Sequence, residues 1–470
     1  MSAPVIVVGA GPVGLMLAGE LRLGGVDVIV LERRETPSGE SRGLGFTARA
    51  TEVFQQRGLL SRFGEVETST QGHFGGIPMD FGVLPGSHFG ARGIPQHRIE
   101  RMLEDRATEL GAKVLRGHEV VDLRQDSDGV VAVVDGPGGH IGLEGAYLVA
   151  CDGGRSTVRG LAGFDFPGTD ATREMYLADV VGRDIRPRFI GERVPGGMVM
   201  SAPLEDGVDR IIVCERGTPH QQRQGVVDFG EVADAWQRLT GESLHGAQTR
   251  WVSAFTDATR QVTEYRRGRV LIAGDAAHTH LPAGGQGLSL GIQDAVNLGW
   301  KLAAAVRGWA PPDLLDTYHA ERHPVGARVL RNTRAQGHLY LSGEEVEPLR
   351  SVLAELIRIP EVGRHLSGMV SGLDIRYDVG PDTHPLLGRR MPGVELRTAR
   401  GLLTGPAVEE GGDWSDRVDL VPGGEPALVR PDGHVVWAGG DGLRGALHRW
   451  FGKANPVTNA ERRIEECTAP

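Results

Sequence analysis

The residues Gly9-Ala10-Gly11-Pro12-Val13-Gly14 form the first pattern in this 470-residue chain whose types and spacing suit a chemical task. In a G-x-G-x-x-G turn, Gly9 permits a tight bend, Gly11 lets the backbone approach a pyrophosphate, and Gly14 lets a helix pack against a strand. Val13 lies inside the same turn, and a helix that starts here offers free N–H groups to phosphate. The pattern predicts a dinucleotide site, but it does not separate FAD from NAD.

The flanking sequence supports this prediction with a strand, a helix and a second strand in order. The expected elements are Val5–Val8, Leu15–Leu23 and Val28–Leu31. Glu32 follows the second strand, where a carboxylate can accept hydrogen bonds from ribose hydroxyls. Arg33 beside it can stack on adenine or reach a phosphate. A glycine-rich turn with a surface glutamate is the alternative interpretation.

A second pattern, D-G-x-x-S-x-V-R, begins at Asp152 and ends at Arg159, directly after an expected strand at Tyr147–Ala150. Two interpretations stay open for Asp152: it caps a strand-to-helix turn, or it contacts a bound cofactor. Arg155 lies in the middle of the pattern. These residues alone do not choose between the two interpretations.

A third pattern, Gly274-Asp275-Ala276-Ala277-His278, follows an expected strand at Val270–Ala273. The carboxylate of Asp275 can accept hydrogen bonds from the hydroxyl groups of a ribityl chain. His278 is a tempting base, but we interpret it as structural because it stands at the start of a turn.

A helix is expected from Ser289 to Ala305, and the glycine-rich stretch Gly284-Gly285-Gln286-Gly287 opens it. The backbone N–H groups of Gly287, Leu288 and Ser289 can lie against the pyrimidine end of a flavin. That end carries negative charge when the flavin is reduced, and a helix start favours negative charge.

Three patterns in this order resemble the aromatic-hydroxylase group of FAD-dependent monooxygenases, the group of p-hydroxybenzoate hydroxylase. The resemblance implies that the first pattern binds the ADP half of FAD, the second contacts FAD and NADPH, and the third binds the ribityl chain. It therefore identifies FAD as the cofactor. It also implies a cycle in which NADPH reduces FAD, O₂ adds at flavin C4a, and the hydroperoxide transfers OH to an electron-rich ring.

The same resemblance assigns roles to residues outside the glycine-rich turns. Arg42 lies where the group carries an arginine near the FAD phosphates, with a surface arginine as the alternative, and Gln96 matches a glutamine that contacts the flavin side chain. Val120 completes the expected cofactor-binding set. Arg42 and Arg155 are the candidates for the NADPH phosphates. Pro282 is the expected catalytic residue, together with Arg42, because its carbonyl can hydrogen-bond the hydroperoxide or the substrate.

Four longer stretches are similar to the angucycline polyketide hydroxylases of actinobacteria, namely Gly39–Arg49, Phe63–Gly76, Arg210–Pro219 and Val262–Ala273. Those enzymes act on multi-ring phenolic polyketides, so the similarity implies an aromatic polyketide and O₂ as substrates. Ser289 departs from the subfamily, which usually carries Asn there. We therefore expect only backbone N–H groups of this segment to serve the flavin.

The resemblance and the changing texture of the chain predict an α/β protein with a Rossmann-like FAD-binding domain, an inserted β-sheet substrate domain and a thioredoxin-like C-terminal domain without C-x-x-C. The expected boundaries are 1–172 for the first part of the FAD domain, with 72–97 contributing to the substrate domain, 173–261 for the sheet, 262–380 for the second part with its long helices, and 381–470 for the C-terminal domain. We expect the substrate cavity between the sheet and the FAD domain, lined partly by Phe74–Phe81 and Met198–Met200.

Composition argues against several other classes of protein. The net charge of −10 argues against nucleic-acid binding, because a polyanion requires a basic surface. The three cysteines, Cys151, Cys214 and Cys467, are far apart, which predicts reduced thiols, no metal site and a cytoplasmic protein. A membrane span needs a run of about 18 apolar residues, and the sequence has none. A homodimer is one option for the assembly.

Other functions stay open beside hydroxylation. The same fold is compatible with rifampicin-type antibiotic inactivation and with Baeyer–Villiger oxygen insertion, both of which occur among relatives of the family. A non-catalytic, flavin-bound sequestering protein is the alternative from another class, and the departure at Ser289 suggests it. Substrate-dependent consumption of NADPH and O₂ separates an enzyme from a sequestering protein.

Overall fold

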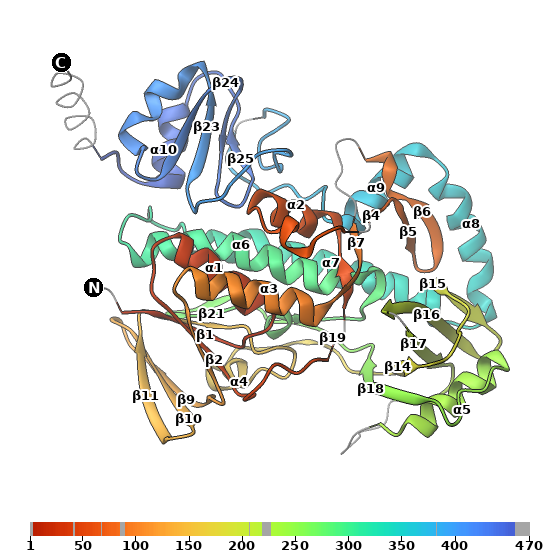
Figure 1. The fold of residues 1–470 in the computed structure, drawn as a ribbon. Coiled ribbons are helices and arrows are strands. Elements are labelled where there is room, and N and C mark those ends of the chain that lie inside the picture. Colours follow the sequence, from red (N-terminus) through yellow and green to blue (C-terminus); the bar gives the residue numbers. More distant parts are fainter. Residues whose placement is uncertain are drawn as a thin grey trace.

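The structure is a computed structural model of the chain (Figure 1). It describes residues 3–40, 43–66, 68–84, 90–205, 207–218, 227–381 and 383–455, without the side chains of residues 44, 91–93 and 205. A parallel sheet with its helices occupies one side of the view and an antiparallel sheet the other, while the C-terminal strands pack above the long helices.

The parallel sheet forms around central strands, β1 (Val5–Val8), β12 (Tyr147–Ala150) and β21 (Val270–Ile272), that are apolar along their whole length. All four residues of the first strand are buried, as the centre of a parallel sheet requires. The strand order is β20-β21-β12-β1-β2-β8, and only β20 runs antiparallel to its neighbour. The strands are β1 (Val5–Val8), β2 (Val28–Glu32), β8 (Lys113–Arg116), β12 (Tyr147–Ala150), β20 (Arg266–Arg267) and β21 (Val270–Ile272).

Helices cover this sheet and approach one another closely. At Gly299, an added Cβ would lie 2.4 Å from the Cβ of Glu20, so glycine allows the long helix α6 to pack on α1. Both helices start earlier than the sequence predicted, since α1 begins at a proline that suits the first helical position and α6 begins at Gln286. The helices on this side are α1 (Pro12–Leu23), α2 (Ala48–Gln56), α3 (Gln96–Glu109), α4 (Thr157–Leu161) and α6 (Gln286–Val306).

Short antiparallel sheets and 3₁₀ turns complete this part of the molecule. The small sheets contain β9 (Glu119–Gln125), β10 (Val130–Gly136) and β11 (Gly139–Gly145); β3 (Leu44–Phe46), β7 (Gly90–Pro95) and β4 (Thr68–Ser69); β13 (Gly168–Thr169), β19 (Thr259–Gln261) and β22 (His278–Thr279); and β5 (Gln71–Phe74) with β6 (Ile77–Asp80). The 3₁₀ turns are Leu60–Phe63, Phe81–Val83, Gly274–Ala276, Ala283–Gly285, Glu344–Val346 and Pro406–Trp414.

A separate five-stranded antiparallel sheet has one face covered by helix α5 (Phe229–Thr240). Ile211 and Val213 point to that helix and pack with its buried Trp236, while the alternate residues Arg210 and Ile212 face the opposite side. The strand order is β15-β16-β17-β14-β18, with β14 (Glu174–Val181), β15 (Arg188–Val194), β16 (Gly197–Glu205), β17 (Val208–Glu215) and β18 (Gln248–Thr256).

Arginines attach this sheet to the end of the long helix α7 (Thr317–Leu341). Arg193 donates to the carbonyls of Tyr340, Ser342 and Gly343 at 2.7–2.8 Å. Arg173 and Arg216 contact the carbonyls of the same helix end. Cations are favourable here because the last carbonyls of a helix lack internal partners. Two further helices, α8 (Glu347–Ile357) and α9 (Pro360–Ser371), follow α7.

The C-terminal part contains β23 (Gly401–Gly405), β24 (Val418–Val429), β25 (Val435–Trp437) and α10 (Leu443–Phe451). The predicted hairpin around residues 431–433 is confirmed, because β24 and β25 pair antiparallel. Its core includes Trp414 and Trp450 and extends onto Trp300 of α6.

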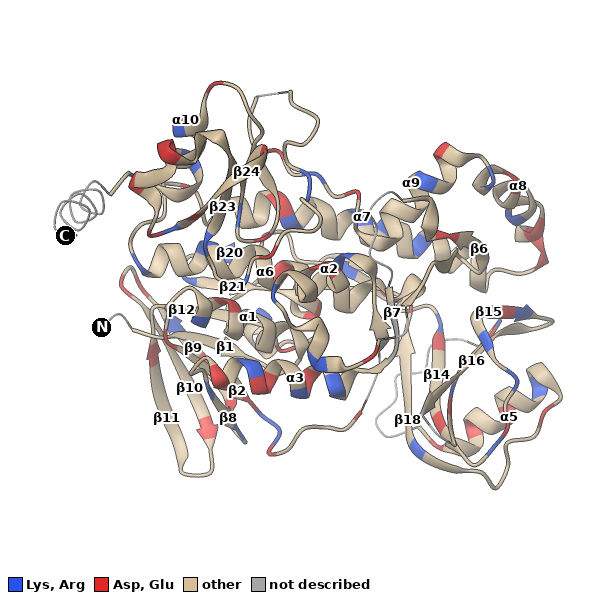
Figure 2. Cartoon of the chain, turned by 45° about the horizontal axis from the view of Figure 1, so that its top comes forward, with Lys and Arg blue, Asp and Glu red and all other residues tan. Residues whose placement is uncertain are grey.

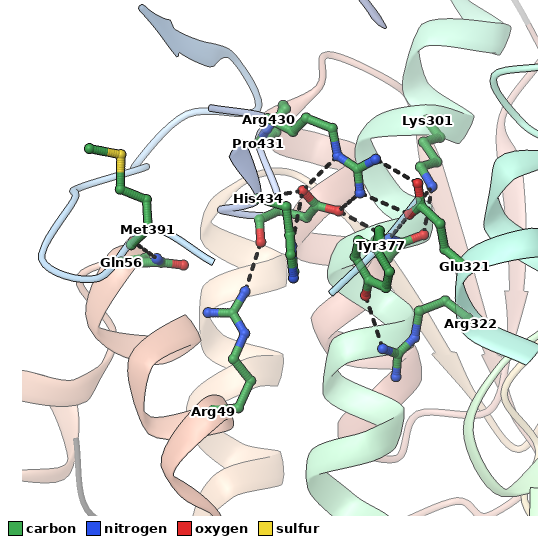
Figure 3. Close-up of polar contacts among 12 residues, drawn as sticks. Arg49, Gln56, Lys301, Glu321, Arg322, Tyr377, Met391, Arg430, Pro431 and His434 are labelled. Carbon is green, nitrogen blue, oxygen red and sulfur yellow. Dashed lines mark hydrogen bonds and ion pairs between the residues drawn. The ribbon is translucent and has the colours of Figure 1, made fainter. Parts of the chain in front are cut away.

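A buried cluster of charges joins this C-terminal part to the long helices (Figure 3). Arg430 forms ion pairs with Glu321 of α7 at 2.6 Å and with Asp432, and Lys301 of α6 lies 2.8 Å from the same glutamate. Burial lowers the pKa of Lys301 to about 8, although the glutamate opposes this change. Arg430 and Lys301 outweigh the effect of burial on Glu321 and lower its pKa to about 2.

Acidic and basic residues alternate over the surface, for example along α3 and α8 (Figure 2). Among the described residues, no helix is both long and apolar enough to cross a bilayer. The predicted fold class is confirmed as a mixed α/β fold with one parallel sheet and additional antiparallel sheets.

Candidate functional site

A cavity of about 2310 Å³ connects the glycine-rich turns with the free face of the middle sheet. The three sequence patterns each follow a strand of the parallel sheet, namely β1, β12 and β21, so the topology gathers them at one edge. Of the predicted site residues, the ones that line the cavity are Gly9, Gly11, Val13, Glu32, Arg33, Gln96, Val120, Asp152, Arg155, Asp275, Pro282, Gly287 and Leu288.

The first turn leaves an open concavity because its glycines lack side chains. Gly9 has φ +107°, and an added Cβ would lie 2.5 Å from the carbonyl oxygen of Cys151. At Gly14 a Cβ would lie 2.0 Å from the carbonyl oxygen of Gly9, so this glycine sets the close packing of α1 on β1. A Cβ on Gly11 would meet nothing within 4 Å, which leaves that backbone open to a ligand.

The carboxylate of Glu32 is oriented by the same turn. Its Oε2 accepts a hydrogen bond from Ala10 N at 2.9 Å, and its Oε1 accepts from Arg34 N at 3.0 Å. Each oxygen keeps further acceptor capacity toward the cavity that Glu32 lines. Arg33 is exposed beside it, and within the described parts of the chain its guanidinium has no ion-pair partner.

Gln96 joins two walls of the cavity at the start of α3. Its Oε1 accepts from Gly43 N at 3.3 Å, and its Nε2 donates to Glu100 at 2.8 Å. Burial raises the pKa of Glu100, which lines the same region. Val120 of β9 is buried at the cavity wall. Arg42 lies outside the described residues, so its predicted roles stay predictions.

The second pattern caps helix α4. Asp152 Oδ2 accepts from Val158 N at 3.1 Å, and Ser156 Oγ accepts from Arg159 N at 2.9 Å. Burial raises the pKa of Asp152. The capping interpretation is therefore correct for Asp152, while its contact with a cofactor stays a prediction. Arg155 is exposed at the cavity wall.

The third pattern contains one exposed side chain, Asp275, and a buried histidine, His278, which pairs with Asp294. Asp275 is exposed to the cavity and forms no hydrogen bond or ion pair with any described residue. His278 is fully buried, and its Nε2 lies 2.8 Å from Asp294 Oδ2. That histidine does not line the cavity, which supports the structural interpretation.

Asp294 is the buried anchor of this loop. Its Oδ2 also accepts from Gly274 N at 3.2 Å, and its Oδ1 accepts from Arg322 Nε at 2.7 Å. Burial alone would raise the pKa of Asp294, but Arg322 and His278 hold it below its usual value. Arg322 also donates to the hydroxyl of Tyr377 at 3.0 Å. Tyr377 packs in the core of the C-terminal part, so this core is linked to the backbone that presents Asp275.

The start of α6 forms the floor of the cavity. Pro282 is exposed to the cavity, and its carbonyl accepts from Gly285 N at 3.1 Å, which leaves one lone pair for a ligand. Ser289 is 2% exposed and does not line the cavity. Its hydroxyl accepts from Thr47 N at 2.9 Å, at the start of α2. The side chain at this position therefore serves the fold, and a role for its backbone N–H stays a prediction.

The prediction for the substrate wall was correct for one segment and wrong for most of the other. Met198 and Met200 line the cavity, as expected. Within Phe74–Phe81, only Phe81 does, because Phe74, Ile77 and Met79 pack against α7, α8 and α9. Sequence reasoning missed polar and aromatic residues of the cavity wall, which are Arg210 and Trp251 on the five-stranded sheet, His73 on β5 and Tyr340 on α7. The period-2 alternation of β17 was the available signal for Arg210.

The cavity fits FAD on the chemistry of its donors and acceptors. An open glycine turn at a helix start suits the pyrophosphate, two carboxylates suit the sugar hydroxyls, and the start of α6 suits the flavin pyrimidine. Within the described parts of the chain, no group of three or more metal-ligating side chains occurs.

Comparison with known protein families identifies the family of this chain. Residues 2–333 match the family described as "FAD binding domain", and residues 403–454 match "Aromatic-ring hydroxylase, C-terminal". The chain therefore belongs to the FAD-dependent aromatic-ring hydroxylases.

Individual relatives share most of their length with it. The 12-dehydrotetracycline 5-monooxygenase/anhydrotetracycline 6-monooxygenase of Streptomyces rimosus is 45% identical over 96% of this chain and 99% of its own. The rifampicin monooxygenase of Streptomyces venezuelae is 45% identical over the same shares. CabE, an aromatic hydroxylase from angucycline biosynthesis, is 59% identical with a TM-score of 0.93, over 97% of this chain and 100% of its own. A Diels-Alderase of pyrroindomycin biosynthesis is 40% identical with a TM-score of 0.85, over 96% and 100%.

Proposed function

We propose that this protein hydroxylates an aromatic polyketide of the angucyclinone type in antibiotic biosynthesis, in the cytoplasm, with NADPH as reductant and O₂ as oxidant. The observation that carries the proposal is one continuous cavity that joins the cofactor turns to a sheet face with apolar and aromatic residues such as Leu177, Ile212 and Trp251. The 59% identity to an angucycline hydroxylase supports this substrate class.

The chain's own residues bind and orient the reactants. Gly11 and the start of α1 hold the pyrophosphate, and Glu32 and Asp275 accept hydrogen bonds from sugar and ribityl hydroxyls. FAD, when bound, supplies the activated oxygen for the reaction. One oxygen atom of O₂ enters the ring and the other leaves as water, while NADPH supplies two electrons. The carbonyl of Pro282 accepts a hydrogen bond from the reacting group, since Gly285 N already fixes its direction.

The finer assignments belong to the same proposal. Arg155 contacts the NADPH phosphates, because it is exposed at the cavity wall and no described residue pairs with it. Residues 173–261 serve as the substrate domain. Residues 381–470 form a thioredoxin-like domain without thiol redox chemistry, since this segment has one cysteine, Cys467, and no C-x-x-C. A homodimer is the assembly that light scattering should test.

The test is an assay of NADPH and O₂ consumption with angucyclinone, anthracyclinone and rifamycin substrates. We expect consumption to rise with an angucyclinone phenol, and product NMR to show a new ring hydroxyl. Substrate should also accelerate anaerobic reduction of the flavin by NADPH, because reduced flavin without substrate wastes NADPH as peroxide. Equal consumption with and without every phenol in the panel would refute the proposal.

Two relatives with different activities suggest alternative functions for this chain. The 45% identity to a rifampicin monooxygenase favours rifamycin as the second candidate substrate, and a new oxygen on rifamycin alone would support it. The Diels-Alderase relative shows that this fold also carries a ring closure, which consumes no NADPH. Baeyer–Villiger insertion also adds one oxygen, but NMR would show an enlarged ring.

A further inference from the structure

The middle sheet places one buried arginine on its cavity face. Arg210 of β17 is 2% exposed and lines the cavity. Its Nε and Nη2 donate to the two carboxylate oxygens of Asp179, each at 2.7 Å. Asp179 stands directly opposite on β14, so the sheet register fixes the pair. A two-point contact of this kind holds the guanidinium plane in one orientation.

The third nitrogen of this guanidinium has no hydrogen-bond partner. Nη1 of Arg210 is buried and unpaired among the residues that the structure describes. It lies at the corner of the guanidinium away from Asp179, because the other two nitrogens occupy the carboxylate. A buried donor without a partner is costly, and native proteins keep few of them. A ligand that enters the cavity can supply the missing acceptor.

The surroundings define which acceptor fits. Trp251 of β18 stands opposite Asp179 on its other side, and the Arg210 guanidinium lies 5.6 Å from the indole centroid. Leu177 and Ile212 line the cavity beside them. Asp179 already balances the charge of Arg210, so the corner offers the two N–H groups of Nη1 on an apolar, aromatic wall without an excess positive charge. A flat ring with an oxygen at its edge matches this arrangement, whereas a doubly charged phosphate needs a cation that is not already paired.

Arg210 also affects the pKa of a histidine on another element. His97, in the first turn of α3, has a lowered pKa because of burial first and then nearby arginines that include Arg210. Its Nδ1 is also buried without a partner. The lowered pKa favours the neutral form of His97, so this histidine adds no charge beside the pair of Arg210 and Asp179.

We propose that Arg210, held by Asp179, anchors the substrate by donating from Nη1 to a phenolate oxygen of a ring that lies along Trp251. The inference rests on the proposed function, because it names the recognition element of the same cavity. Two other roles are outcomes of the test: a cross-strand ion pair that serves only the sheet, and a contact with the flavin.

The test measures binding of two probes to the FAD-loaded protein. 2-Hydroxy-9,10-anthraquinone carries an ionisable oxygen at the ring edge, and 9,10-anthraquinone lacks it. We expect the hydroxylated probe to bind about tenfold more tightly or better, as a charge-assisted hydrogen bond implies. The difference between the two dissociation constants isolates this contact from general stacking.

Two variants remove the free donor in different ways. Arg210→Lys keeps a cation beside Asp179 but loses Nη1. The double variant Asp179→Leu/Arg210→Met replaces the buried pair by apolar side chains, which folded proteins often tolerate. The matched control is Glu215→Leu/Arg238→Met, an ion pair at 2.7 Å between β17 and α5 that does not line the cavity. We expect the probe ratio to fall to about twofold or less in both test variants and to persist in the control.

Each outcome has a distinct meaning. An unchanged ratio in Arg210→Lys and in the double variant overturns the anchor and leaves only a cross-strand ion pair. A weaker affinity of the apoprotein for FAD, with the ratio intact, overturns it in favour of a flavin contact. If the ratio collapses as expected but no phenol in the panel is oxidised, the anchor stands and the proposed hydroxylation fails. Hydroxylation with an unchanged ratio refutes only the anchor.

Discussion

Asp275→Ala tests the cofactor site directly, because the side chain of Asp275 forms no contact that stabilises the described fold. Its carboxylate is exposed to the cavity and has no hydrogen-bond or ion-pair partner among the described residues. Its neighbours in the same loop are fixed by Asp294, which accepts hydrogen bonds from Gly274 and His278. The loop should therefore keep its shape when the side chain of Asp275 is removed.

The expected magnitude follows from one lost acceptor. A hydrogen bond to a charged group is worth about 1.5–3 kcal/mol, and every 1.4 kcal/mol changes a dissociation constant about tenfold. We expect Asp275→Ala to weaken FAD binding by about tenfold to 100-fold. The free energy of unfolding of the apoprotein should change by less than about 0.5 kcal/mol, as for an exposed residue without contacts.

The assay is a titration of the apoprotein with FAD, followed by flavin fluorescence, beside urea denaturation of the same samples. Asp105→Ala, an exposed aspartate on α3 outside the cavity, is the matched control and should bind FAD like the native protein. Asp275→Asn keeps an acceptor and should fall between the two. A dissociation constant of Asp275→Ala within about twofold of the native value would refute the role assigned to this carboxylate.

Three further changes test other parts of the structure. Gly14→Ala would place a Cβ 2.0 Å from the carbonyl oxygen of Gly9, so we expect protein without flavin after desalting, and full flavin content would contradict this packing. Ser289→Ala removes the acceptor of Thr47 N and should lower the free energy of unfolding by about 1–3 kcal/mol in urea melts, with an unchanged midpoint as the contrary result. Because the pKa of Glu321 is lowered from 4.5 to about 2, the folded state should lose about 3 kcal/mol of stability as the pH falls from about 4.5 toward 2. Glu321→Gln should lack this part of the pH dependence in thermal melts, and equal slopes for both proteins would count against the buried ion cluster.

The convergence of the three patterns was predictable because each follows a strand of one parallel sheet. Parallel strands present their carboxyl ends at one edge, so local sequence determines a long-range arrangement. Asp275 was identified for the same reason. Its exposure into the cavity follows from its place directly after β21.

Other features depend on contacts that sequence patterns do not encode. The partner of the Ser289 hydroxyl is Thr47, more than 200 residues away, so its direction could not be deduced from the helix alone. The segment Phe74–Phe81 was expected to face the substrate, but its apolar residues pack against α8 and α9. The sequence analysis did not identify these two helices. The pairing of Arg210 with Asp179 requires the register between β17 and β14.

The middle sheet and the C-terminal part are joined to the long helices by different kinds of contact, and this difference matters for protein engineering. The middle sheet is bound to the end of α7 by arginines that contact backbone carbonyls, and every sequence offers those acceptors. A sheet from a related hydroxylase could therefore be grafted together with its own arginines, provided that the recipient keeps Glu347 of α8, which pairs with Arg193. The C-terminal part relies on side-chain pairs such as Arg430 with Glu321 and Asp432 with Asn297. A chimera with a foreign C-terminus would have to exchange both members of each pair. The natural crossover points for new substrate specificity thus lie around the sheet, while the long helices and the C-terminus should be inherited as one block.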